Sequence, residues 1–252
     1  MRRVFAWLAA AASCAACGGE SVEAQPVEVP VRLAAAPGPV VTDLGYTVRV
    51  TAARQVLSGF VFTRGGEAHA GWLGWLVGTA HAHPGHAAGG EARGELGGRF
   101  VVDWFDAGAP LGTAAILPGR LDGLDFGLGT ATADALGAGD PLVGHNLYLE
   151  AEVSRDERRW TLSLAVPQDA DKQVTGVMCP AEIAAGSTLA LALRVQDPFE
   201  DDTVFDGIDF AAEDPDGDGR IGPDASDSMT NRVRRALQTH DHYEVVAGAG
   251  EE

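Results

Sequence analysis

Residues 146–166 read NLYLEAEVSRDERRWTLSLAV, and they carry the clearest fold signal in the chain. Apolar and polar residues alternate through 146–153 and again through 159–166. This period of two is typical of strands that bury one face. The polar residues 154–158 between the two runs predict a turn. The stretch therefore predicts an antiparallel β-hairpin.

Short apolar runs of the same kind recur along the chain, separated by glycine, proline and polar residues. They predict further strands at 27–34, 46–50, 56–63, 99–104, 114–117, 121–128, 188–195 and 243–246. This spacing is typical of an all-β fold, and we expect an antiparallel β-sandwich, either immunoglobulin-like or jelly-roll-like. The chain has no GxGxxG or P-loop motif and no alternating βα pattern, which argues against a nucleotide-binding α/β fold.

One α-helix is predicted near the C-terminus, at 224–239. Met229, Val233 and Leu237 follow one another at helical spacing, so we expect them on one face. Basic residues gather in the second half of the segment, where they favour the helix dipole. The candidate N-cap residues are Asp224, Ser226 and Asp227.

The N-terminal residues are typical of an export signal. Two arginines precede an apolar run that is too short to span a membrane, and small residues follow it. Residues 14–17, Cys-Ala-Ala-Cys, resemble a bacterial lipobox, which predicts a signal peptide at 1–16 and lipidation of Cys17. The alternatives are cleavage before Cys14, or an ordinary secretory signal with incidental cysteines. By resemblance to known lipoproteins, Gly18 favours the outer membrane, so we expect a lipid-anchored protein in the periplasm or at the cell surface.

The rest of the chain divides into a linker at 17–26, a single β-sandwich domain at 27–247 and a flexible tail at 248–252. After cleavage at Cys17, Cys179 is the one remaining thiol, so no intramolecular disulfide can form. We expect Cys179 to be a buried apolar residue, and a soft metal ligand is the alternative.

The net charge of the chain limits the classes of partner that it can bind. It carries 36 acidic and 18 basic residues, a formal net charge of −18. Such a charge argues against nucleic acid and against direct binding to anionic lipid surfaces, and it favours cations.

A cluster of histidines is the main candidate for a binding site. Residues 79–86 read TAHAHPGH, and His81, His83 and His86 are three of the seven histidines in the chain. If the segment is extended, His81 and His83 lie on one face. The Pro-Gly pair between His83 and His86 suits a type II turn, which would bring the third imidazole close. Three nitrogen ligands with an open position suit zinc or copper.

His240 and His242 are the candidates for completing this transition-metal site. Their spacing would again place both side chains on one face if the segment were extended. The expected function is sequestration or delivery of the metal without catalysis. The alternative is a cell-surface adhesion or structural module whose histidines are incidental.

Residues 214–221, DPDGDGRI, match the first eight positions of an EF-hand-type calcium loop. The ligands at its positions 1, 3, 5 and 7 would be Asp214, Asp216, Asp218 and the backbone carbonyl of Arg220. The twelfth position, normally a bidentate glutamate, is Ala225, so a neighbouring acid such as Asp224 is the candidate substitute. We expect a structural Ca²⁺ here; a solvated acidic turn before the helix is the alternative.

The pair His81-x-His83 followed by Glu91 resembles the cupin metal motif, although the glutamate comes later than that pattern has it. This resemblance implies a second alternative function, a cupin-like metal-dependent enzyme that would need a general base such as Glu91 or Glu95.

Residues 99–105, RFVVDWF, and 117–129, LPGRLDGLDFGLG, resemble a segment of the MbnP-type periplasmic copper-binding proteins. The shared pattern is an apolar strand that ends in an acidic residue, followed by a glycine-rich hairpin. The resemblance implies an all-β fold and raises copper as the candidate ion. The several cysteines of that family have no counterpart here beyond Cys179, so no metal ligand is carried over.

Overall fold

The computed structural model describes residues 24–65, 90–168, 172–222 and 226–249. The strands are β1 (Val27–Leu33), β2 (Val40–Val41), β3 (Thr47–Arg64), β4 (Glu91–Asp103), β5 (Pro110–Ile116), β6 (Gly119–Leu128), β7 (Leu147–Arg155), β8 (Arg158–Val166), β9 (Gln173–Ile183), β10 (Ser187–Leu193), β11 (Arg220–Ile221) and β12 (Tyr243–Ala249). The helices are α1 (Ala133–Leu136), α2 (Asp227–Ala236) and the 3₁₀ helix η1 (His240–His242). The prediction of an all-β fold with a helix near the C-terminus is confirmed.

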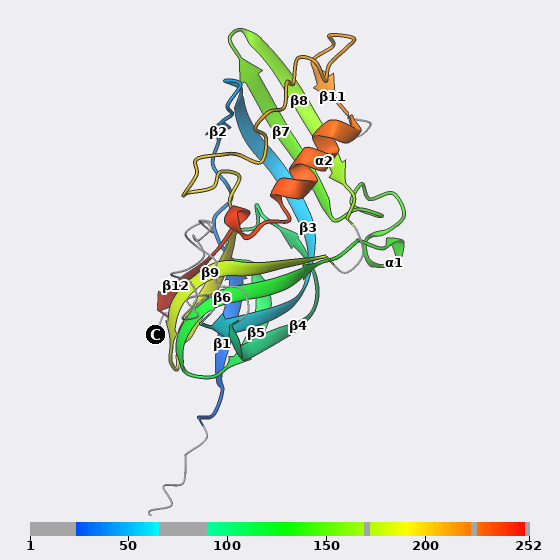
Figure 1. Cartoon of the computed structure of the whole chain (residues 1–252). Coiled ribbons are helices and arrows are strands. Elements are labelled where there is room, and N and C mark those ends of the chain that lie inside the picture. The colour runs from blue at the N-terminus through cyan, green and yellow to red at the C-terminus, as the bar shows by residue number, and fades with distance from the viewer. Residues whose placement is uncertain (1–23, 66–89, 169–171, 223–225, 250–252) are drawn as a thin grey trace, which may run out of the picture.

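The strands form one continuous sheet that folds over on itself (Figure 1). Its main path runs β11-β8-β7-β3-β4-β5-β1-β10-β12, and β6 pairs with both β3 and β9. Most pairs are antiparallel, as predicted, but β1 with β10 and β8 with β11 are parallel, so the sheet is mixed. The strands β12 and β9 come into contact where the sheet folds over, which gives the structure its sandwich-like layers. In the described part of the chain, no helix is long and apolar enough to cross a membrane.

The long strand β3 joins the two halves of the sheet. Its 18 residues join the runs at 46–50 and 56–63, which the sequence predicts as a strand that starts, breaks and resumes. The first half pairs with β7 and the second half with β4 and β6. Near the middle, Gln55, Val56 and Leu57 are all buried, so both faces of the strand are covered at this point. A strand that is covered on both faces loses the alternation by which sequence patterns detect it.

The predicted hairpin at 146–166 is confirmed as β7 and β8. The register runs from Leu147 opposite Val166 to Arg155 opposite Arg158, which leaves two residues in the turn. The expected turn at 154–158 is therefore shorter than predicted. Asp156 takes a φ of +55° in it, a conformation that aspartate tolerates better than most residues.

Strand β9 was not predicted. Its sequence contains Gly176 and Pro180, which normally argue against a strand interior. The proline is tolerated because β9 pairs with β6 along one edge and, among the described strands, has no pairing partner along its other edge. Cys179 in this strand is fully buried, as expected, and burial raises the pKa of its thiol to about 12. This thiol is therefore protonated at neutral pH, and Cys179 belongs to none of the groups of described side chains that could hold a metal ion.

The C-terminal elements are placed correctly, with shifted ends. Helix α2 begins after Ser226, whose hydroxyl accepts a hydrogen bond from the backbone N–H of Met229 at 3.2 Å, and it ends three residues before the predicted end at 239. Met229 and Val233 are buried, as predicted. Strand β12 continues to Ala249, so the first two residues of the expected tail pair with Ser187 and Thr188 of β10.

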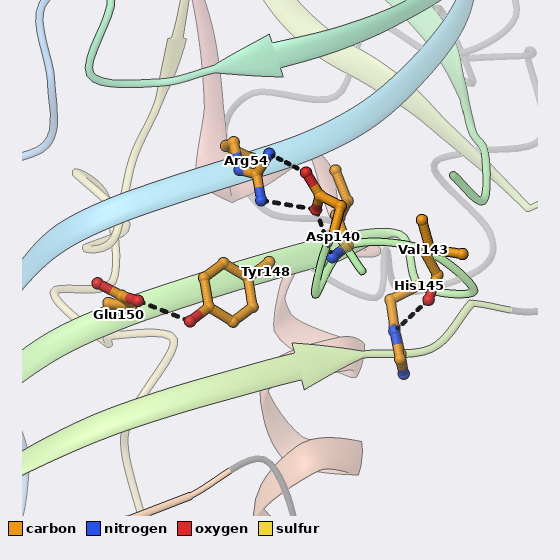
Figure 2. A network of polar contacts seen from close by, with 7 residues as sticks. Arg54, Asp140, Val143, His145, Tyr148 and Glu150 are labelled. Atoms are coloured by element: carbon orange, nitrogen blue, oxygen red, sulfur yellow. Dashed lines mark hydrogen bonds and ion pairs between the residues drawn. The ribbon is translucent and has the colours of Figure 1, made fainter. Parts of the chain in front are cut away.

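The segment between β6 and β7 is fixed on the face of β3 opposite the main core. Val56 packs there with Ala131 and Leu142 in a small apolar cluster. Beside this cluster, the guanidinium of Arg54 donates two hydrogen bonds of 2.8 Å to the carboxylate of Asp140 (Figure 2). The same hydrogen bonds lower the pKa of Asp140. An arginine-carboxylate pair with two parallel bonds fixes orientation as well as distance, so this segment is held in one position on the sheet.

Candidate metal centre

The histidine cluster predicted from the sequence cannot be placed. His81, His83 and His86 lie outside the described residues, as do Cys17 and Asp224. The convergence of the three imidazoles therefore stays a prediction.

His240 and His242 do not have the arrangement that was expected. They belong to a 3₁₀ helix, in which residues two apart are turned by about 240° around the axis, so they do not share a face. The Nε2 atom of His240 lies 2.9 Å from Oδ1 of Asp241, and Nδ1 of His242 lies 3.1 Å from the carbonyl oxygen of Arg194. Burial lowers the pKa of His242, against the opposing charge of Asp202. Among the described residues, neither histidine belongs to a group of three side chains that could hold a metal ion.

His145 is held by the backbone, and the two glutamates named for the cupin-like alternative lie on the surface. Nδ1 of His145 lies 3.1 Å from the carbonyl oxygen of Val143 (Figure 2). Glu91 and Glu95 are exposed at the start of β4, and Glu91 forms an ion pair of 3.5 Å with Arg93.

The acidic loop at 214–218 does form a potential cation site. Asp214, Asp216 and Asp218 each offer one carboxylate oxygen, and these oxygens lie within 4.8 Å of one another. Asp216 and Asp218 are exposed, whereas Asp214 is 5% exposed. Three hard oxygen ligands on one short loop are the set that Ca²⁺ prefers, with water and carbonyl oxygens completing the shell.

The carboxylate of Asp214 is only half satisfied by the protein. Its Oδ2 atom accepts hydrogen bonds from the indole N–H of Trp160 at 3.0 Å and from the backbone N–H of Gly219 at 3.2 Å. Its Oδ1 atom is buried and accepts no hydrogen bond from the described residues. A buried carboxylate oxygen without a partner costs about 1–3 kcal/mol or more, because its desolvation is not compensated. A cation bound between the three aspartates would supply the missing partner.

Two glycines give the loop its shape. Gly217 has a φ of +72° and Gly219 a φ of +79°, both in the left-handed region that glycine enters without strain. Gly219 stands at the sixth position, where the calcium-loop pattern requires a sharp turn. The backbone N–H of Arg220 donates to Oδ1 of Asp218 at 2.8 Å and fixes this ligand at the end of the turn.

The loop is anchored at both ends to regular structure. At its C-terminal end, Gly219 accepts a hydrogen bond of 2.9 Å from the backbone N–H of Thr161, and β11 pairs with β8. At its N-terminal end, the carboxylate of Glu213 accepts a hydrogen bond of 2.7 Å from the hydroxyl of Ser226, the N-cap of α2. In Figure 1, β11 and α2 both lie beside β8. A cation in this loop would therefore tie α2 to the β7–β8 hairpin.

A second acidic group, Asp197, Glu200 and Asp202, has carboxylate oxygens within 4.8 Å of one another. Within this group Asp197 is buried and accepts a hydrogen bond of 2.7 Å from the backbone N–H of Phe199. Desolvation, together with the charges of Asp197 and Glu200, raises the pKa of Asp202. Within the described residues this group has no buried carboxylate oxygen that lacks a partner, so it is the weaker candidate.

Comparisons with known proteins leave the chain without a family assignment. No family model matches it, and no curated protein sequence is significantly similar to it. Among solved structures, MbnP from Methylosinus trichosporium aligns with 90% of this chain and 100% of its own, at 13% sequence identity and a TM-score of 0.35. A similarity this low carries no argument about the site, which rests on the residues of this chain alone.

Proposed function

We propose that this chain is an exported, lipid-anchored metal-binding protein and that the 214–218 loop holds a structural Ca²⁺. The role is one of binding, and no reaction is assigned to it. The observation that carries the calcium site is the buried, unpartnered Oδ1 atom of Asp214 beside two further carboxylates. The cell exterior and the periplasm supply calcium at levels that suit a loop of this kind, because extracellular modules bind Ca²⁺ with a Kd of about 0.1–1 mM.

The site is tested by calorimetric titration of purified, untagged protein with Ca²⁺ in metal-free buffer. We expect one equivalent to bind with a Kd of about 0.1–1 mM. Asp216→Asn and Asp218→Asn each remove one ligand charge, and we expect each to weaken binding about tenfold or more. Asp106→Asn is the matched control, because it removes an exposed carboxylate from the turn after β4.

The control should bind as tightly as the unaltered protein. No Ca²⁺ binding up to 10 mM, or equal affinity in all four proteins, would leave the loop as a solvated acidic turn. The protein would then fit better the alternative of an adhesion or structural module.

A transition-metal function rests on the spacing of His81, His83 and His86 in the sequence. We expect the protein to bind about one equivalent of Cu²⁺ or Zn²⁺, and the triple alanine variant to bind none, since it would lack all three nitrogen ligands. The bound Cu²⁺ or Zn²⁺ of the unaltered protein and of the triple variant is measured after dialysis against a limiting concentration of that metal. His145→Ala serves as the control and should retain the metal. Unchanged metal content in the triple variant would remove this function and leave the calcium site unaffected.

A further inference from the structure

The structure contains a cavity of about 450 Å³, and none of the described residues that line it is acidic. This is unusual in a chain with twice as many acidic as basic residues. Two cations face the cavity, Arg99 and Lys172, and Lys172 is the one lysine in the chain. Apart from Leu128, the remaining lining residues are glycines or have polar side chains. The full lining is Ser58, Arg99, Gly127, Leu128, Gly129, Thr130, Thr132, Lys172 and Gln173.

The strand register builds this cavity. Arg99 of β4 lies opposite Ser58 of β3, Ser58 lies opposite Gly127 of β6, and Gly127 lies opposite Gln173 of β9. Residues directly opposite each other in neighbouring strands place their side chains on the same face. Four strands that run side by side in Figure 1 therefore contribute one row of residues to one wall. Lys172 precedes β9, and its carbonyl oxygen accepts a hydrogen bond of 2.7 Å from the backbone N–H of Leu128.

Glycines keep the floor of the cavity open and seat the arginine. A Cβ atom at Gly127 would lie 2.7 Å from Oγ of Ser58, so a side chain there would push the hydroxyl away. A Cβ atom at Gly129 would lie 3.3 Å from both Nε and Nη2 of Arg99, so the guanidinium lies directly over this glycine. Gly129 is itself held in place, because its carbonyl oxygen accepts a hydrogen bond of 2.7 Å from the side chain of Asn146.

The two cations are available to a ligand. Neither Arg99 nor Lys172 forms an ion pair or hydrogen bond through its side chain with another described residue. The planar guanidinium presents two parallel N–H donors that match the spacing of two oxygens on one phosphate or carboxylate, and lysine adds a mobile point charge. The hydroxyls of Ser58, Thr130 and Thr132 supply further donors.

We propose that this cavity binds a small molecule that carries an oxyanion group, either a phosphate or a carboxylate, through Arg99 and Lys172. Its volume lies within the range of about 300–1,000 Å³ that is typical of small-molecule sites, so it admits more than a bare inorganic ion. Because the ligand would be anionic, this site is independent of the proposed calcium loop.

The proposal is tested by calorimetric titration of the purified protein in chloride buffer treated to remove metals, without phosphate or chelator. The probes are inorganic phosphate, glucose 6-phosphate and citrate, with glucose as the uncharged comparison. We expect at least one charged probe to bind and glucose not to bind. Tighter binding of glucose 6-phosphate than of citrate would identify phosphate esters as the ligand class of the cavity. Tighter binding of citrate would identify organic acids.

Variants locate the site. Arg99→Gln and Lys172→Gln should each lower the affinity for the bound probe at least tenfold. Arg99→Lys keeps the charge but loses the two parallel N–H donors, so its affinity should lie between those of Arg99→Gln and the unaltered protein. Arg32→Gln is the matched control, because Arg32 is an exposed arginine on β1, outside the cavity. The affinity of this variant for the probe should stay within twofold of that of the unaltered protein. Circular dichroism and the thermal midpoint check that every variant is folded. Absence of binding by all charged probes up to 10 mM, or equal affinity in Arg99→Gln and Arg32→Gln, would overturn the proposal.

Discussion

Replacing Gln55 with leucine is expected to lower the free energy of unfolding by about 2–5 kcal/mol. Gln55 is fully buried at the middle of β3, where the two halves of the sheet meet. Its Nε2 atom donates hydrogen bonds to Oδ1 of Asn146 at 3.1 Å and to the hydroxyl of Tyr243 at 2.9 Å. Its Oε1 atom accepts a hydrogen bond of 3.2 Å from the indole N–H of Trp104.

This network is costly to break because its members are satisfied chiefly by one another. Asn146 donates to the carbonyl oxygens of Val56 and Gly129, and Tyr243 donates to that of Leu237. Leucine at position 55 would leave the Trp104 N–H and the Asn146 Oδ1 atom buried without a partner. Each such group costs about 1–3 kcal/mol. The loss should therefore exceed what a change of side-chain volume alone would cause.

Urea unfolding measures the effect, with Gln173→Leu as the control because Gln173 is exposed at the start of β9. The control should stay within about 0.5 kcal/mol of the unaltered protein. Trp104→Phe removes the indole donor of the same hydrogen bond. The losses of unfolding free energy in the two single variants should therefore add up to more than the loss in the double variant. A loss below 1 kcal/mol for Gln55→Leu, or strict additivity, would contradict the network.

The parts of this fold that the sequence predicts well are local. The β7–β8 hairpin and the buried face of α2 follow from periodicity within one element, and both are found. Strand β9 could not be predicted because Gly176 and Pro180 break its pattern, and only its place on an edge of the sheet makes them acceptable.

The candidate sites divide in the same way. The three aspartates of the 214–218 loop lie within five consecutive residues, so their convergence was predictable from spacing alone. The row of residues that lines the cavity at Arg99 and Lys172 depends on the pairing of strands that are far apart in the sequence. His240 and His242 show the opposite error, because the assumed strand is a 3₁₀ helix and the inferred common face disappears.

Saturating Ca²⁺ is expected to raise the thermal midpoint of the protein by about 5–10 °C. A ligand at 100 times its Kd stabilises the folded state by about 2.7 kcal/mol, if the unfolded chain does not bind it. For a domain of this size, each kcal/mol corresponds to about 2–4 °C. Differential scanning calorimetry across a Ca²⁺ series measures the shift, and Asp106→Asn should show the same shift as the unaltered protein.

Asp214→Asn should reverse the order of stability between calcium-free and calcium-loaded conditions. Without Ca²⁺, the three carboxylates repel one another at separations within 4.8 Å, by about 1 kcal/mol per pair in a water-like dielectric. Asparagine removes one of these charges, and its side-chain oxygen can still accept the hydrogen bonds from Trp160 and Gly219. The variant should therefore be at least as stable as the unaltered protein when calcium is chelated.

With Ca²⁺ present, the unaltered protein gains the binding free energy and the variant does not, so the two stability curves should cross as Ca²⁺ rises. A crossing distinguishes a cation ligand from an aspartate whose task is to hold Trp160. If Asp214 served only that task, the variant would keep a constant difference in stability from the unaltered protein at every Ca²⁺ concentration. The sign change depends on one feature of the molecule, a buried Oδ1 atom that no described residue satisfies.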